Sequence, residues 1–205
     1  LNSFKNEKIP PFLILKEGTM DNIARTINLE GTGGEIIRRL VKAVRNGENI
    51  KTFRRDTIRV DDKYCFLFGT GFVTNFLKMA YNGIEKGVLR NSIVAAITAK
   101  EALLNIKEGE IFRQEHFSIT ADGESIDLNP INGLLAGTVE HVGMGFSPLK
   151  DAARHPGKFQ TIITAMEPRK MLLNIHNLRT GQTINDNGYV NSHFNKMTLK
   201  KDGAF

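Results

Sequence analysis

The pattern of apolar and polar positions changes character once along the chain. Residues 9–15, IPPFLIL, form a continuous apolar run whose length predicts a buried strand. Apolar positions at Ile23 and Ile27 then suit a short helix. After a glycine-rich break at residues 30–34, the segment EIIRRLVKAVRNG predicts a second helix that ends at Gly47. This succession is typical of the end of an α/β layer.

Beyond Gly47, turn signals and segments rich in β-branched and aromatic residues dominate. The segments expected to form strands are NIKTFRRDTIRV, YCFLFGTGF, EIFRQEHFSIT, ESIDL, LLAGTVEHVGM, FQTIITAM and YVNSHFNKMTLK. Helices are expected at about 73–85 and 88–106, with a shorter one near 168–178. We therefore predict two domains, an α/β remnant at 1–47 and a mainly antiparallel β-domain with inserted helices at 48–205.

Composition places the chain among soluble globular proteins, with 40% apolar and 24% charged residues in 205. No apolar run approaches the roughly 20 residues that a membrane-spanning helix needs. The opening residues, LNSFKNEKIPP, show no secretion signal. Cys65 is the single cysteine, which excludes an internal disulfide and fits a buried thiol in a reducing compartment. We expect a cytoplasmic protein.

The net charge of +6 favours a polyanionic partner, such as nucleotide phosphates, nucleic acid or an anionic membrane surface. The basic residues are scattered, and those at residues 38–45 alternate with apolar ones as on the solvated face of an amphipathic helix. The chain has no tryptophan and no strip of alternating aromatic and basic residues on which bases could stack. Nucleic acid is therefore disfavoured as a partner.

The stretch KEGTMDNIAR joins the first predicted strand to the first predicted helix through a glycine, a hydroxyl and two Asx residues. Thr19, Asp21 and Asn22 are residue types that satisfy the free N–H groups of a helix's first turn. Gly18 tolerates whatever dihedral angles the turn needs. Taken alone, the stretch favours a helix cap.

Other short motifs also favour structural roles. GTGG, at residues 31–34, lacks the spacing of a nucleotide-binding glycine loop, so an inter-helix break is preferred to a phosphate cradle. FGTGFVTNF, at residues 68–76, fits either an anion site at a helix N-terminus or a tightly packed turn, and the turn is preferred. The five histidines show no metal-ligand spacing, and no GxSxG elbow is present, so neither a zinc site nor a serine nucleophile is indicated.

The order of these features resembles that of the diacylglycerol kinase-like lipid kinases over almost the whole chain. PPFLILKEGTMDNIARTINL is similar to a strand that ends in a Gly-Thr-x-Asn-Asp-Phe-Ala-Arg turn, with the Asn-Asp order inverted here. FGTGFVTNF resembles a Gly-x-Gly-Phe turn, and GIEKGVLRNSIVAAITA resembles a Lys-Gly-Pro-Leu helix start with Val88 in place of proline. ITADGESI resembles an Asp-Gly-Glu hairpin, and GMGFSPLKDAARHPGKFQTII resembles a Gly-Gly-Gly-Phe, Pro-x-Ala, Asp-Gly-x-Leu passage.

The resemblance implies that the first predicted domain is part of an α/β nucleotide-binding domain and that the second is a β-sandwich-like lipid-substrate domain. In such kinases the Gly-Thr turn lies beside the ATP phosphates. Gly18, Thr19, Asp21 and Asn22 would then belong to the nucleotide site, with Thr19 offering its hydroxyl or N–H to phosphate oxygens. ATP and Mg²⁺ are the implied cofactors.

Departures from the family pattern are equally specific. The family's main phosphate loop lies upstream of a segment like LNSFKNEKIPP, and its catalytic carboxylate follows a strand like the one that precedes Phe205. The Asp-Gly-Glu at residues 122–124 matches the earlier hairpin and is not that carboxylate. The metal passage reads His155-Pro156, and proline has no carboxylate with which to hold Mg²⁺. We expect a fragment of a longer kinase whose metal site is lost or relocated.

The implied activity is transfer of the ATP γ-phosphoryl group to a lipid hydroxyl, by a cytoplasmic or peripheral membrane protein. Lys51, Arg54 and Arg55 either help dock an anionic membrane or form a solvated strand face, and the solvated face is preferred. A non-catalytic lipid-binding relative remains an alternative because the metal passage is degenerate. An NAD kinase-type enzyme is disfavoured, since the β-domain follows the lipid-kinase order of motifs.

Overall fold

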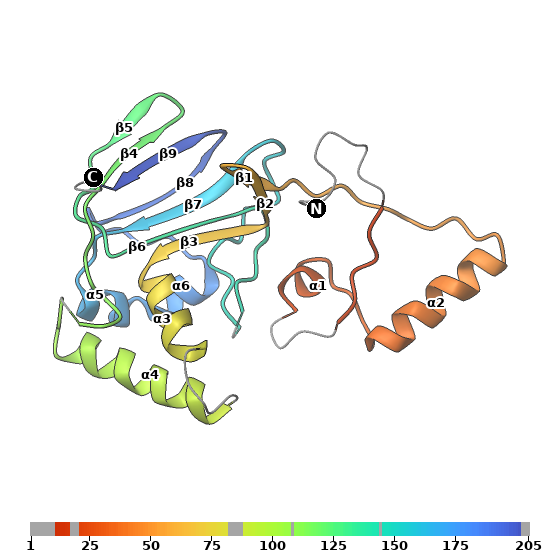
Figure 1. The fold of residues 1–205 in the computed structure, drawn as a ribbon, viewed down its shortest axis with the longest axis horizontal. Helices are drawn as coiled ribbons and strands as arrows, with labels where there is room; N and C mark the ends of the chain where they lie inside the picture. Colours follow the sequence, from red (N-terminus) through yellow and green to blue (C-terminus); the bar gives the residue numbers. More distant parts are fainter. Residues whose placement is uncertain (1–10, 17–20, 82–87, 108, 144, 202–205) are drawn as a thin grey trace.

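The computed structural model describes residues 11–16, 21–81, 88–107, 109–143 and 145–201, and Figure 1 shows their arrangement. Two helices near the start, α1 (Asn22–Thr26) and α2 (Gly33–Arg45), lie to one side of a body built from strands and further helices. The fold is thus mixed strand and helix. None of the described helices is both long and apolar enough to cross a bilayer.

Helix α2 begins at a capping box. The Glu35 N–H donates to the Thr32 hydroxyl at 3.4 Å, and the Thr32 N–H donates back to the Glu35 carboxylate at 2.7 Å. This bond to the Thr32 N–H lowers the pKa of the Glu35 carboxyl. The helix ends where Gly47 takes a left-handed conformation, with φ of 66°. The GTGG segment is therefore the start of a helix, which confirms the inter-helix interpretation.

The strand predicted at residues 9–15 is not found in its described part. Residues 11–16 have no strand structure, and Phe12 and Leu13 are 51% and 45% exposed. A strand needs a neighbour to accept its backbone hydrogen bonds, and none of the strands that the structure describes pairs with this segment. The remainder of the predicted strand, Ile9 and Pro10, lies outside the described residues.

The body contains every strand that the structure describes, and all pairings are antiparallel. The strands are β1 (Ile58–Val60), β2 (Lys63–Cys65), β3 (Leu67–Gly71), β4 (Phe117–Ala121), β5 (Glu124–Ile126), β6 (Gly133–Gly137), β7 (Phe159–Thr164), β8 (Tyr189–Phe194) and β9 (Met197–Lys201). They form a hairpin β1-β2, a four-stranded sheet β3-β6-β7-β8 and a three-stranded sheet β5-β4-β9. The helices of the body are α3 (Phe72–Tyr81), α4 (Val88–Leu103), α5 (Pro168–Leu173) and α6 (Ile175–Thr180). The predicted antiparallel β-region with inserted helices is confirmed.

The central strands β6 and β7 are covered on both faces. Because successive side chains of a strand point to opposite faces, Leu134 and Ile163 join one core cluster with Ile119 of β4. Their neighbours Leu135 and Ile162 pack instead with Leu149 on the other side. Strand β4 alternates buried and exposed positions, as expected for a sheet with one solvated face.

A buried carboxylate joins α4 to the loop that follows it. Glu101 is 6% exposed and accepts hydrogen bonds from the backbone N–H groups of Glu110, Ile111 and Phe112, at 2.9, 3.1 and 3.4 Å. Ile111 and Phe112 are themselves buried in the cluster that packs α4 against α5. Glu101 therefore fixes the loop that brings these two side chains into the core.

We expect Glu101→Ala to lower the free energy of unfolding by about 3 kcal/mol, because it leaves buried N–H donors without an acceptor. Urea denaturation followed by circular dichroism measures the loss. Glu110→Ala is the matched control, since the Glu110 side chain is exposed and only its N–H takes part. Equal losses in the two variants would contradict the structural role of the Glu101 carboxylate.

Candidate functional site

The Gly-Thr turn is described only at its second half. Gly18 and Thr19 lie outside the described residues, whereas Asp21 and Asn22 are described. Asp21 takes the N-cap position of α1 in a left-handed conformation, with φ of 45°, and its carbonyl oxygen accepts the Arg25 N–H at 2.9 Å. Its side chain makes no capping hydrogen bond. The backbone of Asp21, rather than its carboxylate, starts the helix.

Asn22 opens α1, which has five residues and buries Ala24. The Asn22 side-chain oxygen is buried and has no hydrogen-bond partner among the described residues. An amide held in this way can accept a donor through its oxygen, or offer N–H groups to an anion if the amide is turned over. Asn22 is therefore a described residue of this turn whose side chain can still accept a hydrogen bond.

The FGTGF segment forms a tightly packed turn from β3 into α3. Gly71 has φ of 65°, and a Cβ there would collide with the carbonyl of Asn132. The Phe72 N–H, the first of α3, donates to that same carbonyl oxygen at 2.7 Å, and the Thr74 hydroxyl donates to the Gly71 carbonyl at 2.9 Å. The close contact of Gly71 and the internal bond of the Phe72 N–H confirm the packed-turn interpretation.

Asn132 was not singled out by sequence, although it holds this junction together. Its side chain is 1% exposed and donates to the Met166 carbonyl, while its N–H donates to the Thr164 carbonyl at 2.9 Å. Asn132 thus links the β3–α3 turn to the end of β7. Nothing in a single asparagine between Ile131 and Gly133 signals such a role, because its partners are distant in the sequence.

The Asp-Gly-Glu hairpin between β4 and β5 serves as a clasp. The Asp122 carboxylate accepts the backbone N–H groups of Asn195 at 3.0 Å and Lys196 at 2.9 Å, and the Asn195 side-chain amide at 3.1 Å. These bonds, with the nearby Lys158 charge, hold the pKa of the Asp122 carboxyl below its ordinary value. The clasp ties the β4–β5 turn to the β8–β9 turn, so Asp122 has a structural role, consistent with its exclusion as the catalytic carboxylate.

The passage expected to hold metal in the resembling kinases is stabilised here in another way. The Gly157 N–H donates to the Asp56 carboxylate at 2.8 Å, and the rings of His155 and His193 lie 4.2 Å apart. Asp151, four residues earlier than His155, forms an ion pair with Arg154 at 2.9 Å. The contact of Asp56 with this loop is not predictable from local sequence, because the two segments are about 100 residues apart.

Magnesium does not fit this passage. The Asp56 carboxylate already accepts the Gly157 N–H, and the Asp151 carboxylate forms an ion pair with Arg154. Across the described residues, no three histidine, cysteine, aspartate or glutamate side chains are grouped so as to hold a metal ion. Pro156 offers no oxygen ligand from its side chain.

Comparison with solved structures identifies similar folds. Two are named as candidate diacylglycerol kinases of Bacillus anthracis strain Sterne; they have TM-scores of 0.66 and 0.62 and identities of 12% and 13%, and 98% of this chain aligns with 61% and 62% of theirs. A third, named as a diacylglycerol kinase of the same strain, has a TM-score of 0.58 and 12% identity over 90% of this chain and 54% of its own. No protein-family model and no curated protein matches the sequence.

These matches show that the chain has the fold of diacylglycerol kinase-like proteins, which confirms the resemblance read from the sequence at the level of fold. The chain spans about three-fifths of the length of these structures. The short motifs therefore lie on a backbone that follows the same path as those kinase structures. Asp21 and Asn22 are the described residues of the stretch to which the resemblance assigns a nucleotide, and Gly18 and Thr19 lie outside the described residues.

Gly71→Ala tests the packed turn. We expect it to lower the free energy of unfolding by about 3 kcal/mol, because the added methyl group meets the Asn132 carbonyl in a conformation that L-residues disfavour. Gly47→Ala is the control: its φ of 66° matches, but nothing lies within 4 Å of the added Cβ, so only about 1 kcal/mol is expected. Denaturant titration of both variants measures the difference, and equal losses would contradict the close-contact explanation.

The Asp122 clasp predicts a pH dependence. The pKa of Asp122 is lowered in the folded protein, so its stabilising effect is present above the unfolded value of about 3.9 and is lost as pH falls through the folded value. We expect wild type to be more stable than Asp122→Asn at neutral pH, and the difference to shrink steadily in acid. Thermal unfolding across this pH series measures it. A difference that is independent of pH would show that the carboxylate charge contributes nothing.

Proposed function

We propose that this chain belongs to the catalytic region of an ATP-dependent lipid kinase, which transfers the γ-phosphoryl group of ATP to a lipid hydroxyl. The proposal rests on one observation: the backbone of the chain matches that of a candidate diacylglycerol kinase, and its short motifs follow the order typical of that family. At TM-score 0.66, 98% of the chain follows a candidate diacylglycerol kinase, and the short motifs occur in the order typical of that family. The lipid is of the diacylglycerol class or another lipid with a free hydroxyl beside an apolar tail.

In this proposal, residues 1–47 form the end of an α/β nucleotide-binding domain, and residues 48–205 form a β-sandwich-like domain for the lipid. The separation of α1 and α2 from the sheets in Figure 1 supports the division. The core clusters of buried residues also support it, because they draw their members from Ile58 onward.

The proposed nucleotide contacts are Gly18, Thr19, Asp21 and Asn22. Gly18 lets the backbone approach the phosphates, and Thr19 offers a hydroxyl and an N–H to their oxygens. The left-handed backbone of Asp21 sets the direction in which α1 departs, and the Asn22 side-chain oxygen, which has no partner among the described residues, is free to accept a donor at the nucleotide site. Phosphoryl transfer depends mainly on positioning and on neutralising charge, so a fixed donor at Thr19 lowers the barrier without any covalent step.

The β-domain in this proposal supplies a rigid wall against which the acyl chains lie. Strands β6 and β7 are buried on both faces, and the Asp122 clasp and the Asn132 junction fix the surrounding turns. No described carboxylate is proposed as the base that accepts the lipid hydroxyl proton. No step is assigned to magnesium held at His155-Pro156, since the residues there do not fit it.

A non-catalytic lipid-binding protein of the same fold is the second candidate. The observation in its favour is the metal passage, where proline stands in place of a carboxylate and the nearby Asp56 and Asp151 are engaged elsewhere. Such a protein would retain the lipid wall. In that case Thr19 would act only as part of a helix cap.

Thr19→Ala distinguishes these two functions. In the complete polypeptide that carries this sequence, supplied with Mg-ATP and vesicles containing diacylglycerol, we expect the rate of phosphate transfer to fall about tenfold, or about 1.4 kcal/mol of transition-state stabilisation. Thr19→Ser, which keeps the hydroxyl, should retain most of the rate. Radiolabelled phosphate in the extracted lipid measures the transfer.

Thr32→Ala is the matched control, because it removes a hydroxyl that caps a helix in this structure. We expect it to reduce stability without the tenfold loss of rate. If wild type transfers no phosphate to any hydroxylated lipid while still binding vesicles, the catalytic proposal is wrong and the lipid-binding function stands. Equal rates for Thr19→Ala and wild type would remove Thr19 from the nucleotide site.

A further inference from the structure

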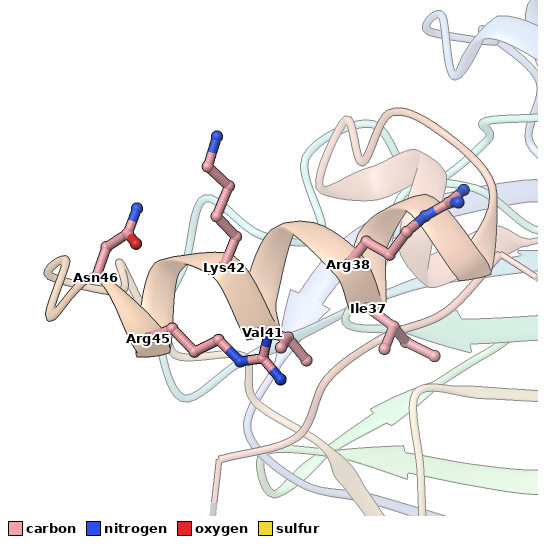
Figure 2. A pocket seen from close by; sticks show the side chains of 6 residues that line it. All are labelled: Ile37, Arg38, Val41, Lys42, Arg45 and Asn46. Carbon is pink, nitrogen blue, oxygen red and sulfur yellow. The ribbon is translucent and has the colours of Figure 1, made fainter.

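The apolar stripe of α2 consists of Ile37, Val41 and Val44, which are 44%, 42% and 61% exposed. Their spacing of four and three residues places them on one side of the helix. Figure 2 shows the hollow beside them, lined by Ile37, Arg38, Val41, Lys42, Arg45 and Asn46. All six lining residues belong to α2 or its C-cap, so no second described element closes the hollow around a ligand. Potential ligand groups from distant segments meet instead on the body.

Two histidine rings meet where the loop at residues 150–158, which we call the His155 loop, passes strand β8. The centroids of the His155 and His193 rings are 4.2 Å apart, and the ring planes are tilted by 57°. Strand pairing brings the rings together, because His193 lies opposite Gln160 in the β7–β8 register and the His155 loop leads directly into β7. Sequence spacing does not reveal the pair, since its members belong to separate elements.

One hydrogen bond fixes which nitrogen of His193 carries a hydrogen. Its Nε2 lies 3.2 Å from the carbonyl oxygen of Asp151, which only accepts, so Nε2 is the donor. In the neutral ring, Nδ1 is then unprotonated and has a lone pair to offer. Histidines that bind metal ions commonly donate their other N–H to a carbonyl or carboxylate oxygen in this way. His193 is therefore prepared to act as a ligand through Nδ1.

The His155 loop is held in place on both sides of His155. Before it, the Asp151 N–H donates to the side chain of Gln160, which is 1% exposed, at 3.0 Å. After it, the Gly157 N–H donates to the Asp56 carboxylate at 2.8 Å. The His155 ring is exposed, and within the described part of the chain its nitrogens have no hydrogen-bond partner. The loop thus presents a free imidazole beside a fixed one.

Imidazole nitrogen selects a different class of cation from carboxylate oxygen. Mg²⁺ prefers oxygen ligands and gives up its water reluctantly, whereas imidazole suits Zn²⁺ and other divalent first-row transition metals. Zn–N bonds are about 2.0–2.1 Å long, so two nitrogens on one zinc ion lie no more than about 4 Å apart. The close approach of the rings meets this limit once the exposed His155 side chain turns its nitrogen toward His193. The passage that does not fit Mg²⁺ therefore offers nitrogen ligands to another ion.

The charges around the histidine pair are balanced. Arg154 forms an ion pair with Asp151 at 2.9 Å. Lys158 lies near the Asp122 carboxylate and helps to lower its pKa. The Asp56 carboxylate adds a negative charge at Gly157. A divalent cation between the rings is thus not opposed by an uncompensated positive charge from the His155 loop.

We propose that His155 and His193 bind a divalent transition-metal cation of the zinc class, which cross-links the His155 loop to β8. Nδ1 of His193 and a ring nitrogen of His155 are the protein ligands, and water completes the coordination. With two protein ligands, the site binds its cation more weakly than a closed four-ligand zinc site. The role of the cation is to hold the loop. The proposal goes beyond the lipid kinase function and does not depend on it.

Calorimetric titration with Zn²⁺ tests the proposal without measuring activity. The complete polypeptide is first stripped with a chelator and then titrated in a buffer that does not bind metal. We expect wild type to bind a Zn²⁺ ion that His155→Ala and His193→Ala each weaken by more than about tenfold, since loss of even an outer hydrogen-bond partner of a ligand costs about 10–100-fold. Excess Mg²⁺ should not displace this ion. Zn²⁺ should also raise the unfolding temperature of wild type more than that of either variant.

His116→Ala and His176→Ala are the matched controls, because each removes an exposed imidazole of the body outside the pair. Both should bind Zn²⁺ as wild type does. His155→Ala keeps the test decisive if His193→Ala fails to fold, since the exposed His155 ring has no hydrogen bond to lose.

Three results would overturn the inference. One is the absence of Zn²⁺ binding to wild type. Another is equal binding by wild type and His155→Ala, or an equal loss in the control variants, which would show that the pair is not the site. The third is displacement of Zn²⁺ by Mg²⁺, which would indicate oxygen ligands elsewhere in the protein.

Discussion

The close approach of the β3–α3 turn to Asn132 is the contact on which the rest of the body depends. Gly71 permits it, the Phe72 N–H bonds to the Asn132 carbonyl, and Asn132 in turn bonds to the end of β7. At this point the four-stranded sheet meets its helices, because Phe72 packs into the core cluster that α4 and α5 share. A side chain at Gly71 would force the turn and the sheet apart. Glycine at this position is thus required by packing rather than by a phosphate.

The body and the preceding helices satisfy different physical demands. From Ile58 onward, buried clusters cover both faces of the central strands, and turns are fixed by carboxylates that accept backbone N–H groups. In α2, by contrast, the backbone is well capped while most of the apolar stripe stays exposed. Capping satisfies hydrogen bonds locally, but only a partner can remove apolar surface from water. The body is therefore covered by its own chain, whereas the apolar stripe of α2 is not covered by the described residues.

A kinase that acts on lipids must hold the nucleotide close to the hydroxyl group of a lipid that comes from a bilayer. In the proposed arrangement, the nucleotide contacts directly precede α2 in the sequence. In the same proposal, the β-domain supplies the wall for the lipid. The degenerate passage at His155-Pro156 shows that the fold persists without carboxylates there, since Asp56 and the histidine pair stabilise the loop instead.

The sequence by itself determined most of the helices, the antiparallel strands and the order of the family motifs, because these depend on periodicity and turn residues that act over a few positions. It also identified the end of α2 near Gly47 and the hairpin at residues 122–124. It was wrong about the described part of the strand predicted at residues 9–15, since pairing needs a neighbour that local pattern does not supply. Only the tertiary structure revealed the Asn132 junction, the Asp56 contact with Gly157 and the exposed stripe of α2. Each of these depends on which distant segments meet, or fail to meet, in space.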